Sequence, residues 1–327
     1  MGVLLHLILT VVGLVVLLAG GEGMVRGAVG LSRRMGISSM VIGLTVVAFG
    51  TSAPELAVNV AAALRAGEIS FGNIVGSNLA NIGLGIGLAA LVRPLRILHV
   101  VVRREIPMML LATAAVLIGG LDPYLSHTPA LYQRSEGFLL LLFFLVFLYY
   151  NLLEVLGNRT EKPASPLAEE ISGPVPSALR SLLLFWTGVA GLVLGAEITV
   201  RYAVALATDL SLPKAFIGFT IIALGTSLPE IATSLIAVRR GETDLLIGNI
   251  VGSNIFNLLF ILGVTSVIRP VPVPAQGFTD LLVLTFFSGL LFLVSLDGTI
   301  RRREGLLLVI LYLLYMAFKT FTAPSLA

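Results

Sequence analysis

Apolar residues fall into runs of about twenty, separated by short polar or basic stretches. Runs of this length suit helices that cross the hydrocarbon core of a bilayer, whereas a membrane β-barrel would show alternating segments of about ten residues. The pattern therefore predicts an all-α integral membrane protein with ten transmembrane helices. The predicted spans are 3–19, 41–64, 71–92, 106–121, 138–156, 182–207, 216–238, 245–268, 278–296 and 306–318.

The lysine and arginine residues agree with this count, because they alternate between loops. Loops that stay in the cytoplasm are enriched in these residues. Fifteen of the 21 follow odd-numbered spans, and the other six lie on the opposite side. This asymmetry predicts that both termini lie outside and that a proline-rich linker, residues 157–180, is cytoplasmic. The linker separates a first five-helix region, 1–156, from a second, 181–327.

A polar hexapeptide with a carboxylate interrupts the second span and recurs in the seventh. Residues 50–55 read GTSAPE and residues 225–230 read GTSLPE. In the spans that follow, residues 72–78 recur letter for letter as 248–254. Each half has five spans, an odd number, so the second half enters the bilayer from the opposite side. The sequence therefore predicts an inverted repeat, an architecture that places the binding site at the midplane between the halves.

The two motif prolines are expected to interrupt their helices. Pro54 and Pro229 cannot donate a backbone N–H, and their rings crowd the carbonyl four residues back. We therefore expect helix breaks near Gly50 and Gly225, which free backbone carbonyls at membrane depth. Such carbonyls are tolerated where they line a cavity, and there they can coordinate cations.

The candidate ligands share one chemistry, side-chain oxygen. An ionisable residue inside a membrane span is costly and marks a functional site by default, and packing does not require a repeated one. The oxygen-bearing side chains that recur in both halves are Glu55, Glu230, Thr51, Thr226, Ser52, Ser227, Ser77, Ser253, Asn81 and Asn257. Asn78 and Asn254 are not included, and the glycine patterns are interpreted as close helix packing.

This all-oxygen set, without imidazole or thiolate, suits hard cations such as Ca²⁺ or Na⁺. Two ionised glutamates carry a charge of −2, which one Ca²⁺ neutralises. We expect that only the loaded site can pass through an occluded state, so that the protein exchanges ions rather than leaking them.

Composition narrows the alternatives. A mean hydropathy of +1.01 with only 12% charged residues excludes a water-soluble globule. The net charge of +3 arises from short loops between apolar runs, so no nucleic-acid partner is expected. The chain has no cysteine, which excludes disulfides and thiolate metal sites. An intramembrane hydrolase is disfavoured because no mid-span His or Asp stands ready to activate a serine.

The paired motifs resemble those of the sodium/calcium exchanger family within the calcium/cation antiporter superfamily. The resemblance rests on 50–55 with 76–81 (GSNLAN), and on 225–230 with 252–257 (GSNIFN). It implies an antiporter that moves several Na⁺ in for one Ca²⁺ out, with no cofactor and no protein partner, in a prokaryotic inner membrane. It also implies that spans one and six slide as a pair across a rigid remainder. The short linker indicates the compact prokaryotic type.

The resemblance also implies roles for the candidate residues. Glu55 and Glu230 would be the central ligands shared by Ca²⁺ and Na⁺, completed by the two amides. The threonines would give backbone and hydroxyl oxygens, and the serines would line flanking Na⁺ sites. Carbonyls beside the helix breaks would come from Ala48 and Ala223.

Several alternatives stay open. Proton-coupled relatives typically carry Gly-Asn before the glutamate, so the Gly-Thr-Ser motif favours Na⁺ as the counter-ion. Asn257 stands where some potassium-dependent relatives have Asp, which argues weakly against K⁺ transport. A cation channel could use the same oxygens, but it needs no inverted repeat.

Overall fold

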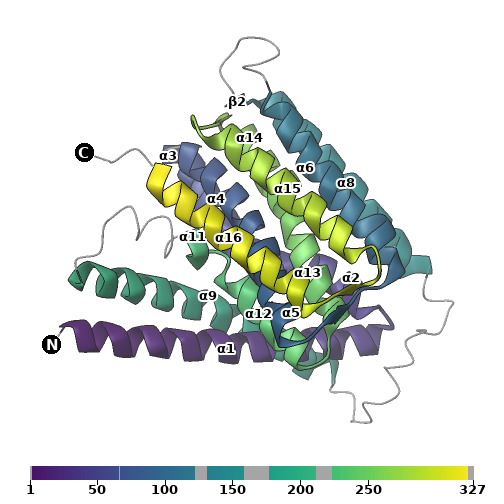
Figure 1. Ribbon diagram of the computed structural model, residues 1–327. Coiled ribbons are helices and arrows are strands. Elements are labelled where there is room, and N and C mark those ends of the chain that lie inside the picture. Colours follow the sequence, from purple (N-terminus) through teal and green to yellow (C-terminus); the bar gives the residue numbers. More distant parts are fainter. Residues whose placement is uncertain (1, 66, 122–130, 158–176, 211–222, 323–327) are drawn as a thin grey trace.

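The computed structural model describes residues 2–65, 67–121, 131–157, 177–210 and 223–322, and most of the predicted linker lies outside this part. As predicted, helices dominate (Figure 1). Those of the first half are α1 (Gly2–Met35), α2 (Ser39–Ile42), α3 (Ala48–Arg65), α4 (Gly67–Ala80), α5 (Gly87–Val92), α6 (Ile106–Gly119) and α8 (Arg134–Gly157). Those of the second half are α9 (Ala178–Asp209), α11 (Ala223–Gly225), α12 (Leu228–Arg239), α13 (Thr243–Ile255), α14 (Leu262–Ile268), α15 (Gly277–Ser295) and α16 (Arg302–Thr322).

Short π-helical segments join several of these helices. η1 (Gly43–Val47) links α2 to α3, η2 (Asn81–Ile86) links α4 to α5, and η6 (Phe256–Ile261) links α13 to α14. A further segment, η3 (Val101–Glu105), precedes α6. The segments η2 and η6 occupy equivalent positions of the two halves, directly after the repeated Gly-Ser-Asn motifs. Single π-turns inside helices occur frequently at functional sites.

Seven of the described helical stretches are long and apolar enough to cross a membrane. They coincide with predicted spans one, two, three, five, six, eight and nine. At the fourth and seventh predicted spans the helices are shorter: α6 has 14 residues and α12 has 12. Residues 211–222 of the seventh span lie outside the described part. The tenth span corresponds to α16, a helix of 21 residues.

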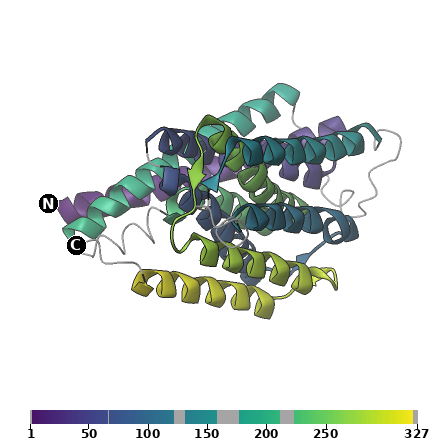
Figure 2. The same ribbon diagram turned by 90° about the horizontal axis from the view of Figure 1, so that it is seen from above.

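The helices α1 and α9 form a closely packed antiparallel pair that lies across the remaining helices, as both views show (Figures 1 and 2). A Cβ atom built on Gly20 would lie 2.4 Å from Leu192 N, and one on Gly188 would lie 2.2 Å from Met24 N. No side chain fits at such distances, so only glycine permits this approach of the two backbones. Small residues at helix interfaces are typical of membrane bundles.

The two halves also exchange short strands. β1 (Leu95–Arg96) pairs with β4 (Thr299–Ile300), and β2 (Leu131–Tyr132) pairs with β3 (Val271–Pro272). Each antiparallel pair takes one strand from each half, so the halves are joined outside the helices as well.

The distribution of polarity is that of a membrane protein. Large apolar side chains are exposed along α1 and α8, including Leu5, Leu142 and Leu145. Buried polar side chains instead concentrate in α3, α4, α12 and α13, the helices that carry the repeated motifs. Polar groups in the interior need hydrogen-bond partners or bound ligands.

Candidate ion-binding site

The two hexapeptides meet at the interface between the halves but differ in backbone shape. The first runs through α3 without a break, with Pro54 inside the helix, so the break predicted near Gly50 is wrong. The backbone adjusts just upstream instead, where the N–H of Ala48 reaches the carbonyl of Gly43, five residues back. In the second copy α11 ends at Gly225, and α12 begins at Leu228 after a two-residue turn, which confirms the predicted break there.

The two glutamates are buried at the centre of the molecule. Glu55 is 1% exposed and Glu230 is fully buried. Ser52 Oγ donates a hydrogen bond to Glu230 Oε1 across the halves at 3.0 Å. Both carboxylate oxygens of Glu55 and Oε2 of Glu230 have no hydrogen-bond partner among the described residues. Buried carboxylates without partners are costly, and a bound cation would satisfy these oxygens.

The two threonines make equivalent contacts across the interface between the halves. Thr51 Oγ1 lies 3.2 Å from Asn249 Oδ1 and 3.4 Å from Ser253 Oγ. Thr226 Oγ1 lies 3.0 Å from the Oδ1 atom of Asn73 and 3.2 Å from Ser77 Oγ. Each threonine of one half thus contacts the asparagine and serine of the other half. The twofold relation expected from the repeat is present in the hydroxyl network.

The two amides, in contrast, are not equivalent. Asn81 Nδ2 donates to Asn254 Oδ1 at 3.0 Å, which leaves Asn81 Oδ1 without a partner in the described structure. Neither polar atom of the Asn257 side chain is hydrogen-bonded to a described residue, and the same holds for Asn78 Oδ1. The bond that would mirror Asn81 to Asn254 is therefore not formed. Asn81 and Asn257 both lie in π-helical segments.

The remaining predicted residues are Ser227, Ala48 and Ala223. Ser227 is buried in the turn between α11 and α12, and its hydroxyl has no hydrogen-bond partner in the described part. The carbonyl oxygen of Ala48 is 3.3 Å from Thr51 Oγ1, so it is directed along α3 toward the site. Ala223 is the first residue of α11, and its side chain is outside the described residues.

Sequence reasoning missed two asparagines, Asn73 and Asn249, and set aside a third, Asn254. The signal was available, because Asn73 and Asn249 belong to the heptapeptide that recurs letter for letter. Each also stands four residues before a predicted serine ligand, Ser77 or Ser253, and residues four apart share a helix face. Their contacts with the threonines follow from this spacing.

The donor set suits a hard cation. No cluster of three or more His, Cys, Asp or Glu side chains occurs in the described residues, so only two carboxylates meet here. Their neighbours are hydroxyl and amide oxygens, ligands typical of Ca²⁺ and Na⁺ rather than zinc or copper.

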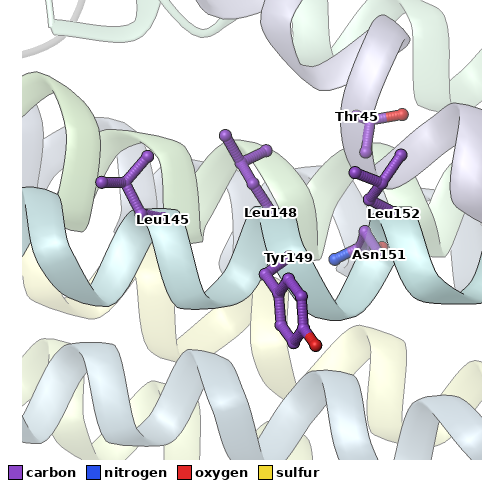
Figure 3. Close-up of a pocket in the computed structure, with 6 residues that line it drawn as sticks. All are labelled: Thr45, Leu145, Leu148, Tyr149, Asn151 and Leu152. Atoms are coloured by element: carbon purple, nitrogen blue, oxygen red, sulfur yellow. The ribbon is translucent and has the colours of Figure 1, made fainter.

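An open pocket elsewhere has a different character (Figure 3). It has a volume of about 470 Å³ and lies between η1 and α8. Its lining is mainly apolar, and none of its residues is a candidate ligand. The lining residues are Thr45, Leu145, Leu148, Tyr149, Asn151 and Leu152. It offers a surface for hydrocarbon rather than a cation site.

Comparison with known proteins identifies the class. The family model for the sodium/calcium exchanger protein matches residues 5–153 and 180–321. The fold and the match define a multi-pass membrane transporter that exchanges cations, not an enzyme. The chain belongs to the sodium/calcium exchanger protein family.

Individual relatives span almost the whole chain. The putative antiporter CaxA of Alkalimonas amylolytica is 37% identical over 317 residues, which cover 94% of this chain and 96% of that protein. The sodium/calcium exchanger MaX1 of Methanosarcina acetivorans is 32% identical over 343 residues, 95% and 97% of the two chains. A structure of the sodium-calcium exchanger NCX_Mj soaked with Na⁺ and Sr²⁺ has a TM-score of 0.81 at 32% identity and covers 96% of this chain and 99% of that chain.

Proposed function

We propose that this protein exchanges Na⁺ for Ca²⁺ at the centre between its two halves. The observation that carries the proposal is the pair of buried glutamates, which approach across the interface through Ser52 and whose other oxygens lack described partners. A divalent cation offsets both charges at once. Membership of the exchanger family and the likeness to MaX1 and NCX_Mj support Na⁺ and Ca²⁺ as the ions.

In this proposal the ligands act in two groups, one central and one flanking. Glu55 and Glu230 hold Ca²⁺ or Na⁺ at the centre, with the amide oxygens of Asn81 and Asn257 completing it. The hydroxyls of the threonines and serines, and the carbonyls beside the hexapeptides, hold further Na⁺. These flanking ligands are Thr51, Thr226, Ser52, Ser227, Ser77, Ser253, Ala48 and Ala223.

The proposed architecture is an inverted pair of five-span repeats, 1–156 and 181–327, with ten spans, both termini outside and the linker, 157–180, in the cytoplasm. The reciprocal strand pairs and the matched threonine contacts support the repeat. Similarity to the inner membrane protein YrbG of Escherichia coli, 37% identical over 272 residues, supports a prokaryotic inner membrane.

Transport proceeds by alternating access. The α1 and α9 pair moves across the other helices and exposes the central site first to one side and then to the other. Several Na⁺ enter for each Ca²⁺ extruded, so each cycle moves net charge. Without a cation the two unpaired carboxylates oppose the occluded state, which couples the two fluxes.

The experiment that tests this function is Ca²⁺ uptake into proteoliposomes loaded with Na⁺. We expect uptake with internal Na⁺, little with internal K⁺, and loss in Glu55→Gln and in Glu230→Gln. Glu136→Gln, the same chemical change in the first turn of α8, is the matched control and retains uptake.

The other outcomes identify the alternatives. Uptake driven by a pH gradient alone would assign the protein to the proton-coupled exchangers. An absolute requirement for K⁺ together with Ca²⁺ would make it potassium-dependent, and a part of the chain, 144 residues, is 27% identical to sodium/potassium/calcium exchanger 1 of Mus musculus. Equal uptake without any counter-gradient would indicate a channel and contradict exchange.

A further inference from the structure

An ion-pair cluster joins α1 to the end of α12. Arg240 Nε lies 2.9 Å from Glu22 Oε2, and a second guanidinium nitrogen contacts Oε1. Arg26 Nη2 lies 2.7 Å from Glu22 Oε1, one helical turn along α1. The Glu22 and Arg240 side chains are 35% and 34% exposed. The cluster therefore lies at the rim of the helix interface, where an ion pair forms and breaks at small cost.

This pair depends on the position of α1 along α12. Next to it, a Cβ atom on Gly21 would lie 2.6 Å from Ile236 Cδ1, so α1 rests directly on α12. One turn further, Thr233 Oγ1 lies 4.0 Å from Met24 Sδ. A shift of α1 by one turn along α12 would carry Glu22 away from Arg240 and break the pair.

The repeat supplies a second copy of the same residues. At a shift of 175 positions, α1 matches α9 and the end of α3 matches the end of α12. The corresponding residues are Glu22 and Glu197, Arg26 and Arg201, and Arg65 and Arg240. Glu197 is exposed. The copy formed by Glu22, Arg26 and Arg240 is engaged in this conformation.

The two halves differ in conformation at the hexapeptides and at the amides. The first hexapeptide lies in an unbroken helix, but the second is interrupted after Gly225. Asn81 bonds to Asn254, but Asn257 does not bond to Asn78. In an inverted repeat, two sequence-related halves in different conformations define one of two states, and the second state arises when the halves exchange conformations.

We infer that Glu22 with Arg240, and Glu197 with Arg65, form two alternating latches, each closed in only one state of the transport cycle. This inference rests on the alternating-access mechanism proposed above. Glu22 and Arg240 hold α1 against α12 in the conformation described here. When the α1 and α9 pair moves, that pair opens, and Glu197 of α9 closes on Arg65 at the end of α3. All four are positioning residues, because none belongs to the ion-ligand set.

Disulfide trapping tests the latches directly, since the chain contains no cysteine of its own. The first variant carries Glu22→Cys with Arg240→Cys, and the second carries Glu197→Cys with Arg65→Cys. We expect both to cross-link in membranes, and each disulfide to stop Ca²⁺ uptake until it is reduced. Glu22→Cys with Arg65→Cys is the matched control. It does not cross-link, because Glu22 lies beside the end of α12, and the ends of α3 and α12 are predicted to face opposite sides of the membrane.

A chain with all four cysteines provides the decisive observation. Mass spectrometry should find one disulfide or the other in each molecule, and never both. Failure of the second pair to cross-link under any Na⁺ or Ca²⁺ condition would overturn the inference, and so would both disulfides in one molecule. These results do not depend on which ions are carried. Absence of Na⁺-driven Ca²⁺ uptake in the chain without introduced cysteines would instead overturn the proposed function.

Neutralising one latch gives a quantitative test through the rate at which the other latch cross-links. Glu22→Gln should speed cross-linking of the Glu197 and Arg65 cysteines roughly two- to fivefold, the range expected for a partly exposed ion pair. Glu197→Gln should speed cross-linking of the Glu22 and Arg240 cysteines by a similar factor. Glu136→Gln should change neither rate. Slower or unchanged cross-linking in both neutralised variants would contradict a latch and leave only local structural roles.

Discussion

At the scale of single residues, the site combines side chains that are already hydrogen-bonded with side chains that are not. Asn81 and Asn257 occupy equivalent places, but only Asn81 has a protein partner, Asn254. Removing a hydrogen bond from a buried acceptor costs about 1 to 3 kcal/mol, whereas removing atoms without partners does not carry this cost. The two amides therefore contribute differently to the ion-free protein.

We predict that Asn81→Ala lowers the Tm of the ion-free protein more than Asn257→Ala does. Both changes remove the same volume, so each is the control for the other. The difference should be about 1 to 3 kcal/mol in the free energy of unfolding. Equal losses of Tm would show that the bond from Asn81 to Asn254 contributes nothing.

A cation that binds only the folded state raises its stability by mass action, by about 2.7 kcal/mol at a concentration of 100 Kd. We predict that Ca²⁺ raises the Tm of the parent protein and that this rise shrinks in both Asn81→Ala and Asn257→Ala. The measurement is a thermal melt in detergent with and without Ca²⁺. A full Ca²⁺ effect in either variant would remove that amide from the ligand set.

The sequence could predict which oxygen-bearing side chains recur inside the apolar spans, but not how they are hydrogen-bonded to one another. Glu55, Glu230 and the threonines were visible because an oxygen-bearing motif inside an apolar span has no packing purpose. The partnership of Asn73 and Asn249 with those threonines depends on how helices from different halves approach, and no local pattern reports that approach. The unequal bonding of the two amides is a property of one conformation, so one sequence cannot reveal it.

At the scale of elements, the two motif prolines have different consequences. Pro54 lies inside α3, where it removes a backbone hydrogen bond to Gly50, whereas Pro229 lies in the first turn of α12, where no bond is lost. We predict that Pro54→Ala raises the stability by about 1 to 3 kcal/mol and slows exchange, because it stiffens the helix beside the site. Pro229→Ala should leave the Tm nearly unchanged. Thermal melts and uptake rates check both, and a lower Tm for Pro54→Ala would contradict this account.

The pair of α1 and α9 depends on glycine in a way that can be tested by one methyl group. We predict that Gly188→Ala lowers the Tm and the uptake rate, because its Cβ atom would lie 2.2 Å from the backbone nitrogen of Met24. Gly289→Ala in α15 is the control, since no described atom outside its own helix backbone lies within 4 Å of its Cβ position. The control should be neutral or stabilising, by up to about 1 kcal/mol, through its better helix propensity. Equal effects of the two changes would contradict a backbone contact at Gly188.

Element positions were the most predictable part of the fold. Apolar runs located helices such as α8 and α15 well, because length and composition decide whether a segment can cross a bilayer. The break expected at Gly50 was wrong, because a proline only removes one bond, and the π-helical turn of η1 upstream let the helix continue. The paired strands were not foreseen, since two residues carry no pattern.

At the scale of the whole molecule, the proposed exchange makes the two glutamates set the charge that must be balanced in each cycle. Two carboxylates carry −2, so a site filled by one Ca²⁺ is neutral, and a site filled by more than two Na⁺ is positive. The proposed exchange of several Na⁺ for one Ca²⁺ therefore moves net positive charge with Na⁺. A voltage acts on each such charge with about 2.3 kcal/mol per 100 mV.

We predict that voltage drives this exchange. In proteoliposomes loaded with Na⁺, an inside-positive potential, set by external K⁺ and valinomycin, should speed Ca²⁺ uptake, because net positive charge leaves with Na⁺. An inside-negative potential should slow it. Vesicles with equal K⁺ on both sides and valinomycin are the control at zero potential. An uptake rate that does not change with the potential would indicate two Na⁺ per Ca²⁺, and the inverse dependence would indicate fewer than two.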